Sequence, residues 1–200
     1  GRAALKLGAG KVLLGLLTDH PPDVDYLHPE LMIGRAEPVL AGAAPDAMAI
    51  GPGMGVDVAA QRILSQALRM DVPIVVDADA LNLIATLSVL QASVLGRSAP
   101  TILTPHPAEA ARLLGMKTPE VQADRVQAAC ELARRFKSLI VLKGNGSVLA
   151  APDGRWWITT SGPSSPEVST QSPGSTSRHW TPSEPRRSMY ASKSSRLIMA

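Results

Sequence analysis

The stretch PIVVDADALNLIATL at residues 73–87 decides the fold class. Its first part, Pro73–Val76, is an uninterrupted apolar run, which is typical of a strand buried on both faces of a sheet. Its second part opens with two aspartates and then carries apolar residues at helical spacing, which predicts a helix over Ala80–Leu87. A buried strand that runs directly into a helix is the repeating unit of a parallel α/β sheet.

The same unit recurs on both sides of this stretch. The predicted strands are Lys11–Leu17, Ala47–Ile50, Thr101–Leu103 and Leu139–Leu142, and the predicted helices are Val56–Met70, Pro107–Leu114 and one longer helix from Pro119 to about Phe136. Val148–Ala151 and Trp156–Thr159 predict a hairpin, and residues 18–46 read mostly as connection with one short strand near Leu31–Ile33. The pattern predicts an α/β fold with a mostly parallel sheet covered by helices on both faces.

Composition narrows the classes of protein that remain. Of the 200 residues, 45% are apolar and 3% aromatic, so the core must be built from aliphatic side chains. The net charge is +3, but no Lys/Arg stripe is interleaved with aromatics, which argues against a nucleic-acid partner. No apolar run is long enough to span a membrane. The single cysteine, Cys130, excludes an internal disulfide, reads as core and favours a cytoplasmic location.

The last forty residues differ in character from the rest. Residues 161–200 are rich in Ser, Pro and Arg and show neither strand alternation nor a helical stripe. Such a segment has little apolar surface to offset the entropy lost on ordering. We therefore expect one domain over residues 1–160 and a tail over 161–200 that is disordered or the product of a shifted reading frame.

Four unusual segments each come directly after a predicted strand. They are Gly51–Gly55, Asp77–Ala80, Thr104–Pro107 and Lys143–Ser147. The carboxyl ends of parallel strands meet at one edge of a sheet, and ligands bind there. The sequence therefore predicts that the four segments form one site.

Two of these segments offer a backbone cradle and carboxylates. The Gly51–Gly55 loop has no bulky side chains to block a phosphate or ribose, although a tight strand-to-helix turn explains it equally well. Asp77 and Asp79 precede Asn82, and strand-end carboxylates suit Mg²⁺, which keeps part of its water shell. The alternative is that one aspartate caps the following helix, and this applies above all to Asp79.

The other two segments offer an imidazole and a cation. His106 lies between two prolines, which favours substrate contact over the alternative of a structural cap. Glu109 is expected in the first helical turn, where its charge suits the helix dipole. Lys143 and Gly144 suit nucleotide phosphates, whereas a simple β-turn would explain the glycines but not the lysine.

Together these segments resemble one family. IGPGMG (50–55), VVDADALNLIA (75–85), ILTPHPAEAARLLG (102–115) and VLKGNGSVLAAPDG (141–154) occur in order, and GRAALKLGAGKV (1–12) precedes them. Over residues 1–160 the chain resembles the ADP/ATP-dependent (S)-NAD(P)H-hydrate dehydratases, which form the C-terminal domain of bifunctional NAD(P)H-hydrate repair enzymes.

The resemblance implies a ribokinase-like lyase that repairs hydrated NADH or NADPH while splitting ADP or ATP, with Mg²⁺. It also implies a homo-oligomer and a fused or separate epimerase as partner. The implied substrate-binding residues are Gly53, Gly55, Asp79, Asn82 and His106. The implied nucleotide-binding residues are Lys143, Gly144, Asn145, Gly146 and Ser147, and the implied metal ligand is Asp77.

The chain departs from the family pattern at both ends. The family domain begins earlier, with a Gly/Ala-rich segment, and continues into an N-x-G-x-x-x-x-G-G-x-G-D element whose aspartate is the expected catalytic base. Residues 160–200 contain no aspartate, so no catalytic residue is predicted and we expect impaired activity. The alternatives are another ribokinase-like small-molecule kinase, a non-catalytic nucleotide-binding fragment and, least favoured, a nucleic-acid binder acting through the basic tail.

Overall fold

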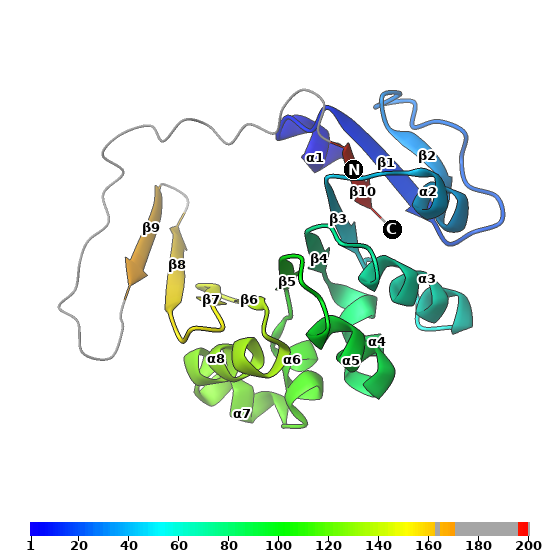
Figure 1. The fold of residues 1–200 in the computed structure, drawn as a ribbon. Helices are drawn as coiled ribbons and strands as arrows, with labels where there is room; N and C mark the ends of the chain where they lie inside the picture. Colours follow the sequence, from blue (N-terminus) through cyan, green and yellow to red (C-terminus); the bar gives the residue numbers. More distant parts are fainter. Residues whose placement is uncertain (163–164, 171–195, 200) are drawn as a thin grey trace.

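A computed structural model describes residues 1–162, 165–170 and 196–199 of the chain. Its strands form one sheet in the order β2-β1-β10-β3-β4-β5-β6-β7-β8-β9 (Figure 1). The strands are β1 (Lys11–Leu16), β2 (Met32–Arg35), β3 (Ala47–Ile50), β4 (Ile74–Val76), β5 (Thr101–Leu103), β6 (Leu139–Leu142), β7 (Val148–Ala150), β8 (Trp156–Gly162), β9 (Ser165–Thr170) and β10 (Arg196–Met199).

The helices lie between the strands along the chain, in places two or three in succession. They are α1 (Arg2–Lys6), α2 (Ala36–Gly42), α3 (Val58–Leu68), α4 (Ala78–Thr86), α5 (Ser88–Leu95), α6 (Pro107–Leu114), α7 (Thr118–Ala123) and α8 (Arg125–Phe136). Within the described ranges, no single helix has the length and apolar content needed to cross a membrane. The pair α4 and α5 reaches them only when joined, and it is bent by 109°.

The direction of the strands confirms the predicted fold class. Every neighbouring pair from β2 to β6 is parallel, including β3–β4, where Met48 lies opposite Ile74, and β4–β5, where Val76 lies opposite Leu103. The pairs β6–β7, β7–β8 and β8–β9 are antiparallel, so the predicted hairpin of β7 and β8 is also confirmed. The sheet is mixed and mostly parallel.

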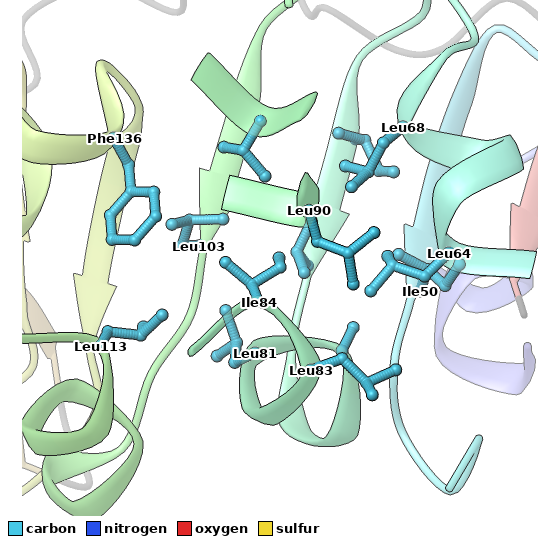
Figure 2. Packing of buried hydrophobic residues seen from close by; sticks show 14 of the residues in the cluster. Ile50, Leu64, Leu68, Leu81, Leu83, Ile84, Leu90, Leu103, Leu113 and Phe136 are labelled. Atoms are coloured by element: carbon cyan, nitrogen blue, oxygen red, sulfur yellow. The ribbon is translucent and has the colours of Figure 1, made fainter. Parts of the chain in front are cut away.

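An aliphatic core holds the helices onto the sheet (Figure 2). Ile50, Val76 and Leu103 point into it from β3, β4 and β5, and Phe136, the only phenylalanine, packs into it from α8. Alternate strand positions such as Val75 are only half-buried. The helices of the described ranges therefore cover one face of the sheet more completely than the other.

Cys130 packs against this core, as predicted. Its partial burial raises the pKa of the thiol, opposed by the Arg134 charge and reinforced by Asp124. The thiol is thus kept in its protonated, unreactive form at neutral pH.

Three parts of the structure differ from the prediction. Residues 18–46 hold a short helix, α2, as well as the expected strand. A further helix, α5, directly follows α4, although the sequence pattern predicted no helix at this position. The single helix expected from Pro119 to Phe136 is two helices, because the Asp124 side chain accepts a hydrogen bond from Gln127 N and so starts a new helix.

The segment predicted as a structureless tail contains two strands. β9 pairs with β8, and β10 lies between β1 and β3, where it is parallel to both. Ile198 of β10 is 1% exposed and belongs to the main core, because Leu197, Ile198 and Met199 form an apolar run in an otherwise polar segment. Residues 171–195 lie outside the described residues, and the boundary at residue 160 stays a prediction.

Candidate functional site

The four segments that follow the strands meet at the carboxyl edge of the sheet. Asp77 N donates to Ile50 O at 3.0 Å, Thr104 N to Val76 O at 3.1 Å, and Lys143 N to Pro105 O at 2.8 Å. Each segment is thereby tied through its backbone to the strand end or the segment beside it. The predicted convergence of the four segments is confirmed.

An ion pair between Asp77 and Lys143 lies at the centre of this edge. Lys143 Nζ is 2.6 Å from Asp77 Oδ1, although 66 residues separate the two in sequence. Burial by itself would raise the pKa of the Asp77 carboxyl, but hydrogen bonds from Lys143, the Ala78 amide and Thr104 outweigh burial and hold the pKa below its usual range. Asp77 is therefore an anion at neutral pH, facing a cation.

Asp77 is also the residue that begins α4, since its carboxylate accepts a hydrogen bond from Ala78 N at 2.8 Å. The alternative interpretation, in which one aspartate caps this helix, is therefore confirmed, but the cap is Asp77 and not Asp79. Asp79 instead reaches across to the glycine loop, where its Oδ2 accepts from Gly55 N at 2.9 Å. Ala78 between them has φ +48°, an unusual value for a non-glycine residue, and this turn lets the two carboxylates face different segments.

The glycine loop lies very close to the next strand end. A Cβ on Gly51 would lie 1.8 Å from Asp77 O, and Gly51 has φ +128°. Among the residues that the structure describes, none lies within 4 Å of a Cβ built on Gly53 or Gly55. Gly51 is therefore required by packing, whereas Gly53 and Gly55 leave open space at the sheet edge.

His106 begins α6 through a reciprocal capping arrangement with Glu109. Its Nδ1 accepts from Ala108 N at 3.1 Å and Glu109 N at 3.3 Å, and its own backbone N donates to Glu109 Oε2 at 2.8 Å. Nε2 lies 3.3 Å from Glu109 Oε1, while the side chain is 47% exposed. The structural alternative, in which His106 is a helix cap, is thus confirmed, and about half of the side chain remains exposed.

Two arginines at this edge contact predicted site residues but were not themselves predicted from the sequence. Arg112 donates to Asn82 Oδ1 at 2.8 Å and fixes the amide that the resemblance places at the substrate. Arg125 donates from Nη1 to Asn145 O at 2.9 Å and from Nη2 to Leu142 O at 3.2 Å. Each arginine lies on a predicted helix, where an arginine is ordinary, so no pattern in the sequence distinguishes them.

The Lys143–Ser147 loop joins two antiparallel strands, so the turn interpretation describes how it connects them. Ser147 N donates to Thr159 Oγ1 at 3.1 Å, and Thr159 N donates to Ser147 O at 2.9 Å. The turn does not explain the lysine, which points to Asp77 instead. A lysine held by one carboxylate can exchange that partner for a phosphate.

Two cavities adjoin the glycine loop and share Leu17 and Met54 in their walls. One, of about 200 Å³, is mostly apolar and is lined by Leu14, Ala49, Gly53 and Met199 among others. The second, of about 250 Å³, is polar and includes Thr18, Asp19, Arg35, Glu37 and Asp57. A larger cavity of about 310 Å³ near Arg97, before β5, contains none of the predicted residues.

The described residues contain no group of three or more His, Cys, Asp or Glu side chains placed to hold a metal ion. Mg²⁺ is commonly held by one or two carboxylates together with substrate phosphates. Asp77, beside Lys143, fits such a shared arrangement.

Comparison with known proteins places the chain in a family. Residues 1–168 match the family model described as NAD(P)H-hydrate dehydratase. The chain is 40% identical over 164 residues to the ADP-dependent (S)-NAD(P)H-hydrate dehydratase of Neisseria meningitidis, a match covering 80% of this chain and 55% of that protein. It is 36% identical over 166 residues to the bifunctional NAD(P)H-hydrate repair enzyme of Coxiella burnetii, covering 80% and 32%. The chain thus spans between a third and just over half of these relatives.

Solved structures of this family and of the same fold also resemble the chain. The ADP/ATP-dependent NAD(P)H-hydrate dehydratase of Bacillus subtilis, co-crystallised with ATP and Mg²⁺ and soaked with CoA, superposes with a TM-score of 0.60 at 31% identity, covering 80% of this chain and 61% of that one. A ribokinase-like superfamily protein of Enterococcus faecalis, 24% identical, gives a TM-score of 0.56 over 74% of this chain and 52% of its own, which supports the fold alone. The family model matches residues 1–168, which is well over half of this chain, and the chain therefore belongs to the NAD(P)H-hydrate dehydratase family.

Proposed function

We propose that the chain binds an adenine nucleotide and a hydrated nicotinamide dinucleotide at the carboxyl edge of β3 to β6. The observation that carries this proposal is the ion pair between Lys143 and Asp77, which joins two segments of the family pattern at the end of two strands. The loop glycines and the Lys143 ammonium suit phosphates, because a cation and unhindered backbone amides attract anions. We propose Lys143, Gly144, Asn145, Gly146 and Ser147 as the nucleotide-binding residues.

The substrate would lie beside this loop, against Gly53, Gly55, Asp79, Asn82 and His106. Asp79 and Asn82 are already oriented by Gly55 N and Arg112, so they need no rearrangement to present polar atoms. Both ring nitrogens of His106 face partners within its helix cap. We therefore propose that His106 contacts the substrate with its exposed ring surface and does not transfer a proton.

The reaction of this family, as its members' names describe it, removes water from NAD(P)H-hydrate in an ADP- or ATP-dependent manner. Mg²⁺ would enter with the nucleotide phosphates, and Asp77 is the carboxylate we assign to it. We propose that the 200-residue chain binds both ligands but turns over slowly, because residues 160–200 offer only Glu167 and Glu184 as carboxylates and no Gly-Gly-x-Gly-Asp element. Loss of a general base typically lowers a rate by about 10² to 10⁴-fold.

The supporting experiment is a thermal shift with ADP and Mg²⁺. A ligand that binds only the folded state raises the melting temperature by mass action. We expect ADP to stabilise the chain, and Lys143→Ala to abolish the shift. Lys11→Ala, at the exposed amino end of β1, should leave the shift unchanged and serves as the control. An unchanged melting temperature at millimolar ADP in a folded chain refutes the nucleotide site.

A second arm tests turnover. Recovery of NADH absorbance from hydrated NADH, with ADP or ATP and Mg²⁺, should stay near the no-enzyme control. Nucleotide-dependent recovery well above that control refutes the proposed impairment and leaves the binding proposal standing. An epimerase partner, a homo-oligomer and a cytoplasmic location stay predictions, and the bifunctional relatives favour the first of these.

A further inference from the structure

The side chain of Arg125 attaches the Lys143–Ser147 loop to helix α8. Arg125, the first residue of α8, donates from Nη1 to Asn145 O and from Nη2 to Leu142 O. These two carbonyls flank Lys143 and Gly144 on either side. One planar guanidinium therefore fixes the distance between the two ends of the turn.

The loop is shaped to admit this guanidinium. A Cβ on Gly144 would lie 2.6 Å from Arg125 Nη2 and 2.9 Å from Arg125 Cζ, closer than side-chain carbons come. The missing side chain at Gly144 is thus what lets Arg125 reach the carbonyls. The requirement for glycine here comes from α8 as well as from any ligand.

The contact leaves one nitrogen of the Arg125 side chain in an unfavourable environment. Arg125 Nε is buried and has no hydrogen-bond partner among the described residues. Leaving a buried donor unpaired is unfavourable, so stability alone would favour a side chain without this group. What arginine supplies is a rigid planar fork with two terminal nitrogens, each of which reaches one carbonyl, whereas lysine and glutamine each have a single donor nitrogen.

We propose that Arg125 is a positioning residue for the nucleotide: by clamping Leu142 O and Asn145 O, it holds the backbone of the Lys143–Ser147 loop in the conformation that receives the phosphates. This inference rests on the proposed function, because the phosphate is the ligand being positioned. The clamp acts on the segment whose first residue is tied on its other side to Pro105 O and, through Nζ, to Asp77. Lys143 is thereby fixed from both directions.

The test compares Arg125→Lys with wild type in the full chain. The lysine keeps the positive charge and most of the stem but replaces the two-nitrogen fork with one nitrogen on a flexible stem. We expect its melting temperature to stay close to that of wild type without ligand, its dissociation constant for ADP with Mg²⁺ to rise about tenfold, and amide exchange to accelerate at Lys143 and Ser147. Exchange in the core strands should not change. Arg134→Lys, on the exposed face of the same helix, is the matched control.

A second variant addresses the same clamp from the loop. Gly144→Ala should displace the guanidinium and produce the same faster exchange, and combining it with Arg125→Lys should add little, because both changes break one contact. Unchanged exchange at Lys143 and Ser147 in Arg125→Lys overturns the clamp. Faster exchange with unchanged ADP affinity overturns the positioning role. If wild type itself does not bind ADP, the proposed function fails, and the exchange data still decide whether the clamp exists.

Discussion

The Asp77 carboxylate is held by Lys143, which follows β6, by the hydroxyl of Thr104, which follows β5, and by the amide of Ala78 in α4. The contacts of this one residue therefore join three parts of the fold. Sequence reasoning placed Asp77 and Lys143 at the same edge, because each follows a strand. It could not pair them, because a contact between residues 66 positions apart depends on the order of β4, β5 and β6 in the sheet.

The ion pair makes stability depend on pH. The pKa of Asp77 is depressed in the folded state, so the contribution of the pair is fully present above the unfolded pKa of about 3.9 and is lost as pH falls through the folded pKa. Because both side chains are partly exposed, we expect no more than about 1 kcal/mol. Urea unfolding of wild type and Asp77→Asn should show a gap at pH 6 that narrows below about pH 4. A gap that is constant or widens on acidification would contradict this assignment.

At the scale of elements, sequence patterns located strands and helices well where each begins with its own signal. Pro107–Leu114, with His106 before it and Gly115 after it, was predicted to the residue. The break between α7 and α8 was missed, because Asp124 is one polar residue within a continuous helical pattern and acts only through its cap. Helix α5 was missed because its apolar residues, Leu90 and Val94 among them, follow α4 with no turn residue between.

The turn after β3 offers a test of how closely two elements approach. Gly51→Ala would force a methyl group into Asp77 O, and we expect a loss of about 3 kcal/mol in the free energy of unfolding, at the upper end for overpacking. A Cβ on Gly53, in the same loop, has no neighbour within 4 Å among the described residues, so we expect only its positive φ to oppose Gly53→Ala, at about 1 kcal/mol. Chemical denaturation of both variants measures the difference. Equal losses would mean that backbone strain, and not contact with Asp77 O, dictates Gly51.

At the scale of the whole molecule, β10 joins two parts of the sheet. β2 and β1 lie on one side of it and β3 to β9 on the other. Composition suggested that residues 161–200 would lack regular structure, and the three apolar residues of β10 in a Ser/Pro-rich segment are too few for a pattern to reveal a central strand. Met199 of this strand also lines the apolar cavity beside the glycine loop.

Ile198→Asp tests this role of β10. A carboxylate at a position only 1% exposed has no partner to offset its desolvation, and we expect a loss of several kcal/mol, of order 3 or more. Hydrogen exchange should show β1 and β2 losing protection before β4 and β5 do. Leu139→Asp, on a strand position that is 44% exposed, is the control. If all strands of the sheet lose protection together, β10 does not specifically hold β1 and β2 to the rest of the sheet, and this prediction is wrong.

The position of β10 also affects how the chain is made. Lys11 pairs with Arg196, about 185 positions later. At a synthesis rate of roughly 5–20 residues per second, β1 leaves the ribosome about 10–40 s before the strand that joins it to β3. Until then β1 and β3 each expose unpaired backbone along one side, which is the kind of edge that other nascent chains can pair with. Among the strands that the structure describes, the one that fills the middle of the sheet is therefore made last, and we expect the gap between β1 and β3 to stay open until then.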